Sequence, residues 1–266
     1  MTTISSDYAL TDAERLAFER RGCLKLRGVI DPEELQPFAD EITDQVIRLN
    51  TQSLPLAERD LYSRAFLQVT NLWRQSALVE KFVRSTDLAR LAADLLGVAS
   101  VRLYHDQALY KERGGGITPW HADQYYWPLS TDRSVTIWIP LQDTPMAAGP
   151  LSFATGSHRF QYARDLPISA ESEQRIAELM LEQQYAVDAG PYALGDVSYH
   201  LGWTFHRAGE NTADFARRVM TIIYVDADMV IGEPRNDNQV KDLAAWAPGR
   251  KPGDRLDTDL NPVLYP

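Results

Sequence analysis

The chain has 266 residues, of which 44% are hydrophobic and 24% charged, a composition that indicates a globular protein and excludes disordered and collagen-like classes. Its 27 Lys and Arg against 37 Asp and Glu give a net charge of −10, so we expect no nucleic acid partner and no attraction to anionic membranes. The sequence contains no run of about 20 apolar residues and no signal-peptide pattern, which predicts a cytoplasmic protein without a membrane span.

Residues 1–100 are predicted to be mostly helical, because apolar residues recur there every three or four positions. Capping residues mark the expected ends of these helices: Thr11 with Glu14, Gly22, Asp31 with Pro32, and Ser85 or Thr86 before a helix over Leu88–Leu96 that Gly97 ends. A strand is expected between the first two helices, over Cys23–Ile30.

From Val101 onward the pattern changes to an alternation of period two, which is typical of strands. The predicted strands cover 101–110, 118–123, 134–141, 151–154, 197–200, 203–206 and 217–225. A helical insert is expected near 170–184, and residues 229–266 are predicted to form an irregular C-terminal tail because they are rich in Pro and Asp.

Helices followed by many short strands predict a mainly β protein with helices, of the α+β class. We expect a double-stranded β-helix, or jelly roll, over residues 101–228, with the N-terminal helices packed on one face. Because β-sandwiches and barrels reach about 250 residues as one unit, residues 1–266 are expected to form a single domain.

The five histidines offer a candidate metal site, since the single cysteine, Cys23, cannot build a thiolate site alone. Only His121 has a carboxylate two residues on, Asp123, and residues i and i+2 of an extended strand project from the same face. Two His and one carboxylate on one face of an octahedron are typical of non-haem iron. A His-x-Asp pair alone is a weak signal, because pairs of this kind also arise by chance.

Two downstream residues strengthen this hypothesis. His206 lies at the end of a predicted strand, and a hairpin from it is expected to bring Arg217 onto the neighbouring strand. An inward-facing arginine beside a metal site requires an anion, which a dicarboxylate co-substrate would supply.

At these residues the chain resembles the phytanoyl-CoA dioxygenase family of Fe(II)- and 2-oxoglutarate-dependent oxygenases, whose fold is cupin-like. The resemblance covers about Leu103 to Val225 and rests on five blocks in the family's order: TPWHADQYYWP (118–128), WIPLQD (138–143), GPLSFATGSH (149–158), GDVSYHLGWTFHRAGEN (195–211) and RRVMTIIY (217–224). Together these blocks are specific, whereas any one of them is not.

The resemblance implies a role for five residues. His121, Asp123 and His206 would bind the iron, Arg217 would hold the distal carboxylate of 2-oxoglutarate, and Trp138 matches an aromatic position near this co-substrate. Gln107 and Thr118 are expected to contact it too, because their strands should line the same end of the barrel. Tyr125, Tyr126 and Trp127 follow Asp123 and are expected to wall the substrate pocket, with filling of the core as the alternative. The chain departs from the pattern at Ala208, where many members carry a hydroxyl side chain.

The remaining three histidines are not expected to be metal ligands. His158 and His200 are expected to be structural hydrogen-bonding residues, and His105 faces the same way as Gln107 and could reach the cavity.

The implied activity is oxidation, by default hydroxylation, of an unactivated C–H bond with O2 as co-substrate. The aromatic residues favour a bulky, mostly apolar small molecule, such as a polyketide or terpenoid secondary metabolite. The protein is expected to be a monomer or homodimer. The same radical chemistry could instead drive epimerisation, cyclisation or desaturation, whereas the intact Asp123 argues against halogenation. Two alternatives stay open: a jelly-roll metal-dependent small-molecule binding protein, and a cupin-type enzyme that does not use 2-oxoglutarate.

Overall fold

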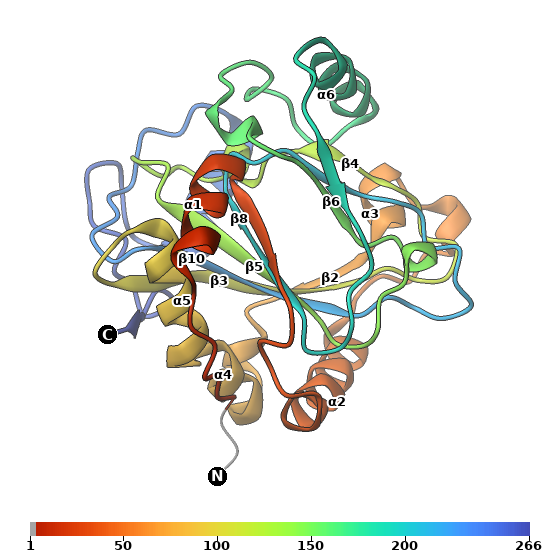
Figure 1. Cartoon of the computed structure of the whole chain (residues 1–266), viewed down its shortest axis with the longest axis horizontal. Helices are drawn as coiled ribbons and strands as arrows, with labels where there is room; N and C mark the ends of the chain where they lie inside the picture. The colour runs from red at the N-terminus through yellow and green to blue at the C-terminus, as the bar shows by residue number, and fades with distance from the viewer. Residues whose placement is uncertain (1–3) are drawn as a thin grey trace.

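Two antiparallel sheets stand opposite each other in the computed structural model, which describes residues 4–266 (Figure 1). The strands are β1 (Cys23–Leu26), β2 (Leu67–Thr70), β3 (Val101–Tyr110), β4 (Thr118–His121), β5 (Ser134–Pro140), β6 (Leu151–Ala154), β7 (Val187–Ala189), β8 (Val197–Leu201), β9 (His206–Ala208), β10 (Val219–Asp226) and β11 (Val263–Tyr265). In the described part of the chain, the larger sheet has the order β1-β8-β5-β10-β3-β11, with β2 also on β3, and the smaller has the order β4-β9-β6-β7. The predicted jelly roll is confirmed.

Helices cover the outside of this double layer. They are α1 (Asp12–Arg21), α2 (Pro32–Leu49), α3 (Leu61–Ala65), α4 (Ala77–Val83), α5 (Thr86–Leu96), α6 (Ala170–Glu182) and α7 (Asp237–Trp246). Helices α2, α4 and α5 lie on one side of the larger sheet, whereas α6 lies against β4 of the smaller sheet (Figure 1). Among residues 4–266, no helix is both long and apolar enough to span a lipid bilayer.

The larger sheet has two chemically different faces, because neighbouring residues of a strand point to opposite sides. Its outer face carries apolar side chains such as Ile137 and Ile222, which pack with the helices in the main core. The inner face carries polar and aromatic side chains instead, among them Thr136, Trp138 and Thr221. The alternation in the sequence therefore separates the core that stabilises the fold from the surface that faces the cavity.

The predicted helix ends are confirmed at the residues that cap them. Thr11 and Glu14 form a capping box, Asp31 accepts a hydrogen bond from Glu33 N–H, and Ser85 accepts one from Leu88 N–H. Gly97 ends α5 in the left-handed conformation, with φ of 65°.

Two of the expected strands differ clearly from those in the structure. The first strand ends at Leu26 rather than Ile30, because Gly28 turns the chain with φ of 60° and donates its N–H to Asp196. The strand expected over 203–206 begins only at His206, since Thr204 N–H bonds back to Leu201 O in a turn.

The irregular tail expected over 229–266 is wrong: it contains α7 and β11. Asn236 caps α7 through Gln239 N–H, and β11 pairs with β3.

The expected hairpin between His206 and Arg217 is also wrong. β9 belongs to the smaller sheet and β10 to the larger one, so the connection crosses from one sheet to the other. Arg217 pairs with Lys111 instead, each residue donating its backbone N–H to the carbonyl of the other at 2.9 Å. Arg217 therefore reaches the cavity from the opposite sheet to His206.

Candidate metal centre

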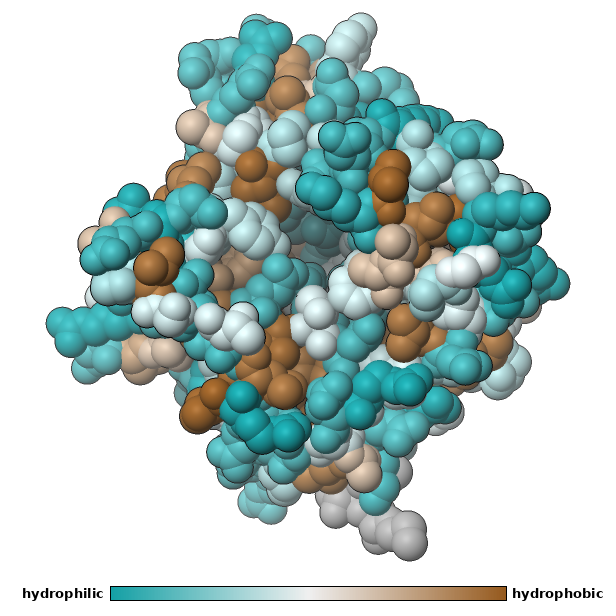
Figure 2. All heavy atoms as spheres, turned by 180° about the vertical axis from the view of Figure 1, so that it is seen from behind, coloured by the Kyte–Doolittle hydropathy of each residue, from teal (hydrophilic) through white to brown (hydrophobic). Residues whose placement is uncertain are grey.

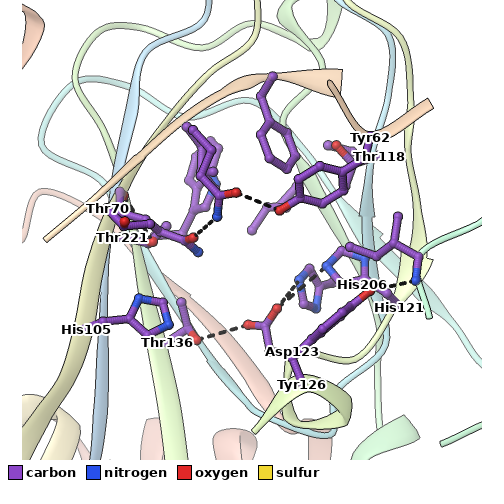
Figure 3. Close-up of a pocket in the computed structure, with 18 of the residues that line it drawn as sticks. Tyr62, Thr70, His105, Thr118, His121, Asp123, Tyr126, Thr136, His206 and Thr221 are labelled. Atoms are coloured by element: carbon purple, nitrogen blue, oxygen red, sulfur yellow. Dashed lines mark hydrogen bonds and ion pairs between the residues drawn. The ribbon is translucent and has the colours of Figure 1, made fainter. Parts of the chain in front are cut away.

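The smaller sheet brings His121 and His206 together. The two residues are paired across β4 and β9, with ring centroids 4.1 Å apart. Ala122 is extended, and Asp123 Oδ1 lies 3.6 Å from His121 Nε2 and 3.5 Å from His206 Nε2. Ligand atoms of all three residues lie within 4.8 Å of one another (Figure 3). This spacing allows the three side chains to bind one ion.

Backbone carbonyls fix the orientation of both imidazoles. His121 Nδ1 lies 2.7 Å from Pro119 O, and His206 Nδ1 lies 3.0 Å from Thr204 O. Because a carbonyl oxygen can only accept, Nδ1 carries the proton in each ring and Nε2 keeps its lone pair. Both Nε2 atoms are those that face Asp123, as a metal ligand requires.

The second oxygen of Asp123 is held by the larger sheet. Thr136 Oγ1 donates to Asp123 Oδ2 at 3.1 Å, and His200 Nε2 lies 3.2 Å from the same oxygen. Thr136 and His200 are direct cross-strand neighbours on β5 and β8. Their contacts orient the carboxylate so that Oδ1 faces the two imidazoles.

The charge states of the cluster fit a metal site. Burial and the neighbouring His121 lower the pKa of His206 well below its usual value, so this imidazole is neutral. Burial raises the pKa of Asp123, but nearby His206 and the hydrogen-bonding histidines lower it by more, so the carboxyl is ionised. Neutral imidazoles and an ionised carboxylate are the forms that bind metal ions.

This donor set suits ferrous iron. Two nitrogens and one oxygen can occupy one face of an octahedron and leave three adjacent positions for other ligands. A structural zinc site would instead fill its positions with protein ligands.

The cluster lies in a cavity of about 480 Å³ between the sheets. Its lining draws on both sheets, on the segment around Ile168 and on α7. The face of the molecule opposite to that of Figure 1 is hollowed near its centre (Figure 2). The volume falls within the range of about 300–1,000 Å³ that is typical of small-molecule sites.

Arg217 lines the same cavity and is buried. Its Nη1 donates to Gly149 O at 2.6 Å, its guanidinium carbon lies 5.5 Å from the centre of the Trp138 ring, and its Nε has no partner within residues 4–266. Burial lowers the pKa of Arg217 to about 10, so it stays charged at neutral pH. A buried guanidinium without an acidic partner is a site for an anion.

The other expected co-substrate contacts share this cavity. Trp138 and Gln107 point inward from the larger sheet and Thr118 from the smaller one. Gln107 Oε1 accepts a hydrogen bond from Gln68 Nε2, and Thr118 Oγ1 lies 3.4 Å from the buried Lys111 Nζ.

The aromatic residues after Asp123 divide into two groups. Tyr126 and Trp127 line the cavity, and Tyr126 OH accepts a hydrogen bond from Ile168 N–H at 2.8 Å. Tyr125 lies outside the cavity lining and packs edge-on against Tyr126, while its carbonyl accepts a hydrogen bond from Gln239.

Sequence reasoning missed three features of this site. His200 lines the cavity and contacts Asp123, although the signal was present, since Val197 and Tyr199 on the other face of β8 are apolar. The position of Lys111 next to the cavity was missed because this residue belongs to no recognisable sequence motif. The wall that α7 contributes was missed because the tail was expected to be irregular.

His105 also lines the cavity and stacks on Trp246, with ring centroids 4.7 Å apart. His158 does not line the cavity and lies against Gly22 instead.

Comparisons with known proteins agree with this geometry. The profile of the family described as Phytanoyl-CoA dioxygenase (PhyH) matches residues 18–219. A protein named probable alpha-ketoglutarate-dependent hypophosphite dioxygenase, from Stutzerimonas stutzeri, is 26% identical over 156 residues, which are 56% of this chain and 54% of that protein. The ectoine dioxygenase of Nocardia farcinica is 24% identical over 237 residues, 82% of this chain and 78% of that protein.

Solved structures show the same fold. The non-heme alpha ketoglutarate dependent carbocyclase SnoK from nogalamycin biosynthesis superposes with a TM-score of 0.79 and 22% identity, over 97% of this chain and 98% of that one. The epimerase SnoN, in complex with Fe3+, alpha ketoglutarate and nogalamycin RO, superposes with a TM-score of 0.78 and 23% identity, over 95% and 98% of the two chains. With the profile matching well over half of its length, the chain belongs to the phytanoyl-CoA dioxygenase family.

Proposed function

We propose that this protein is an Fe(II)- and 2-oxoglutarate-dependent dioxygenase that oxidises a C–H bond of a small organic molecule. His121, Asp123 and His206 hold the iron, and Arg217 binds the distal carboxylate of 2-oxoglutarate. The observation that carries the proposal is that three potential ligands and a buried arginine without an acidic partner line one cavity. Family membership supports the same chemistry.

The residues of the chain do the positioning in this reaction. Iron with 2-oxoglutarate and O2 supplies the oxidising power, as in other enzymes with this ligand set. Thr136 and His200 hold the carboxylate ligand, while Pro119 O and Thr204 O hold the imidazoles. The apolar and aromatic parts of the lining, including Trp127 and Tyr126, exclude water and bring one substrate carbon close to the metal.

The direct test is titration of 2-oxoglutarate into the anaerobic Fe(II) protein. We expect saturable binding with a metal-to-ligand charge-transfer absorption. Absence of both would favour a jelly-roll binding protein, and turnover that does not depend on 2-oxoglutarate would favour a cupin-type enzyme without this co-substrate.

Three variants separate the assigned roles. Asp123→Ala and His206→Ala should each abolish Fe(II) binding or activity, whereas Arg217→Ala should retain Fe(II) and raise the KM for 2-oxoglutarate by about 100-fold, because a charge-assisted bidentate contact is lost. Full activity of Asp123→Ala would overturn the assignment of the ligands.

The outcome of the oxidation depends on which substrate atom is held nearest the metal. Hydroxylation is the default, and the structural similarity to a carbocyclase and an epimerase supports cyclisation and epimerisation as alternatives in natural-product biosynthesis. Product masses distinguish the three, because hydroxylation adds one oxygen, cyclisation removes two hydrogens and epimerisation leaves the mass unchanged.

Several expectations from the sequence stay predictions. We expect a monomer or homodimer in the cytoplasm, with no nucleic acid or membrane partner, in line with the net charge of −10. We also expect one domain over residues 1–266 and substrate contacts at Tyr126 and Trp127.

A further inference from the structure

Helix α7 presents one polar face to the cavity. Asn238, Asp242 and Trp246 follow one another at intervals of four residues, so they lie on the same side of the helix, and all three line the cavity. They form its wall together with His105 of β3, whose ring stacks on Trp246 at 4.7 Å. None of these residues belongs to the proposed metal or co-substrate site.

Asp242 has no cationic partner. In the part of the chain that the structure describes, no lysine, arginine or histidine nitrogen lies within 4 Å of its carboxylate. Its Oδ2 accepts a hydrogen bond from Tyr104 OH, which orients the carboxylate without neutralising it. The side chain is partly exposed because it faces the open cavity.

The charged groups expected in the loaded cavity pair with one another and leave Asp242 without a partner of opposite charge. Among the lining residues within 4–266, the carboxylates are those of Asp123 and Asp242 and the guanidinium is that of Arg217, beside four histidines. In the loaded site, the two negative charges of 2-oxoglutarate offset Fe(II), and the charge of Arg217 offsets that of Asp123. Asp242 is then left without a group of opposite charge, so its ionised form is favoured only when the substrate brings a cation.

The surroundings of Asp242 favour an organic cation. Trp246, Trp127 and Tyr126 line the same cavity, and aromatic faces attract ammonium groups. His105 Nδ1 is buried and has no partner among the described residues, so this wall of the cavity holds an unused hydrogen-bonding nitrogen. An ammonium group can donate to the Asp242 carboxylate, whereas a carboxylate or phosphate group would be repelled by its ionised form.

We propose that the substrate carries a protonated amine that binds Asp242, with its apolar body extending towards the metal. This inference rests on the proposed function, because the charge balance assumes Fe(II) and 2-oxoglutarate in the site. It adds a substrate class, a bulky apolar molecule with a basic nitrogen, and makes Asp242 the residue that selects it.

The protonation states of Asp242 and its neighbours provide a second way to detect binding of an amine. Burial raises the pKa of Asp242 to about 8 and that of Tyr104 well above its usual value, and burial lowers the pKa of His105 to about 4. At pH 7 all three groups are therefore mostly neutral before the substrate binds. An ammonium group stabilises the ionised carboxylate, so its binding should release a proton from Asp242.

The test compares naphthylmethylamine with naphthylmethanol as probes of the anaerobic Fe(II) and 2-oxoglutarate-loaded protein by isothermal titration calorimetry. We expect the amine to bind about tenfold more tightly than the alcohol, which corresponds to one charge-assisted contact. Asp242→Asn should remove this preference, whereas Asp237→Asn, the same change on the exposed first turn of α7, should keep it.

The proton release provides a measurement on the unaltered protein. In buffers of different ionisation enthalpy at pH 7, binding of the amine should release up to one proton, and binding of the alcohol should release none. Equal affinities for the two probes, a preference that survives Asp242→Asn, or no saturable binding of the amine would overturn the proposal.

The charge-transfer absorption of 2-oxoglutarate is recorded in the same samples. Its absence would refute the proposed function, whereas its presence without a preference for the amine would refute the substrate class alone.

Discussion

Asp123 uses its two carboxylate oxygens for different tasks. Oδ1 faces the two imidazoles, at 3.6 Å from His121 and 3.5 Å from His206, while Oδ2 receives contacts from Thr136 and His200. These contacts come from the larger sheet, so the orientation of the proposed carboxylate ligand depends on residues outside the His121, Asp123 and His206 cluster. Such partners commonly influence metal affinity as strongly as a weak ligand does.

Thr136→Val tests this arrangement. The variant keeps the shape of the side chain and removes the donor to Asp123 Oδ2, so Fe(II) affinity should fall by about tenfold, measured by anaerobic titration. Thr221→Val is the matched control, because Thr221 is equally buried on the same face but donates to Gln107 O. Unchanged affinity in Thr136→Val would show that His200 alone positions the carboxylate.

Lys111 is a buried amine next to Arg217. Its Nζ donates to Gly116 O, and among residues 4–266 no carboxylate lies within 4 Å of it. Burial, with a smaller contribution from Arg217, lowers the pKa of Lys111 to about 6 from 10.5. The unfolded chain therefore binds this proton more tightly than the folded one, so the free energy of unfolding should rise with pH between about 6 and 10.5.

Lys111→Met should stabilise the protein without its ligands. We expect the free energy of unfolding in urea to increase by about 2 kcal/mol at pH 7, because an unpaired buried amine is replaced by an apolar chain. The gain should shrink at pH 9, because removing the proton that the unfolded chain holds costs less free energy at higher pH. Lys81→Met on the exposed side of α4 is the control and should change stability little. A gain independent of pH would argue that packing rather than charge is responsible.

Gln239 is one of the side chains that join helix α7 to the segment after Asp123. Gln239 Nε2 donates to Tyr125 O at 2.9 Å, and its Oε1 accepts from Arg235 N–H at 2.8 Å. Tyr125 lies in the short 3-10 helix that begins at Asp123. The position of the Asp242 wall therefore depends on a contact two residues away from a proposed metal ligand.

Gln239→Ala should loosen this element. The loss of a buried hydrogen-bonding side chain should lower the free energy of unfolding by about 1–3 kcal/mol and speed hydrogen exchange over residues 237–246. Gln174→Ala on the exposed side of α6, where the amide bonds only to Glu178, should have neither effect. Exchange that is slow in both variants would mean that apolar contacts alone hold α7.

The elements that the sequence predicts well are those with strong local signals. The alternation from Val101 to Tyr110 and the caps at Thr11 and Ser85 depend on neighbouring residues alone, and the structure has the strand and both caps. The pairing of β10 with β3 and β5 rather than β9 depends on contacts between distant segments, which is why the placement of Arg217 beside His206 was wrong. Helix α7 was missed because nearby Pro and Asp residues obscured its short apolar pattern.

At the scale of the whole molecule, the proposed metal site joins the two sheets. His121 and His206 come from the smaller sheet, whereas Thr136 and His200 reach Asp123 from the larger one. Arg217, two residues before β10, would by the same proposal hold the co-substrate against the larger sheet as well. Loading the site should therefore stabilise the contact between the sheets.

Fe(II) with 2-oxoglutarate should raise the Tm of the anaerobic protein. At ligand concentrations of about 100 times Kd, binding adds about 2.7 kcal/mol to the free energy of unfolding. Asp123→Ala should lose this shift, and Asp237→Asn, an exposed carboxylate on α7, should retain it. The same increase in Asp123→Ala would place the stabilising metal elsewhere on the chain.

The make-up of the ligand cluster, two imidazole nitrogens and one carboxylate oxygen, has a consequence for how the protein acquires its metal. Donors of these types hold cobalt, nickel, copper and zinc more tightly than ferrous iron, following the Irving–Williams order. Affinity alone would therefore load the wrong ion, and correct metallation depends on the supply of iron in the compartment where the chain folds. Traces of zinc in a growth medium would act as an inhibitor that occupies the cluster before any iron arrives.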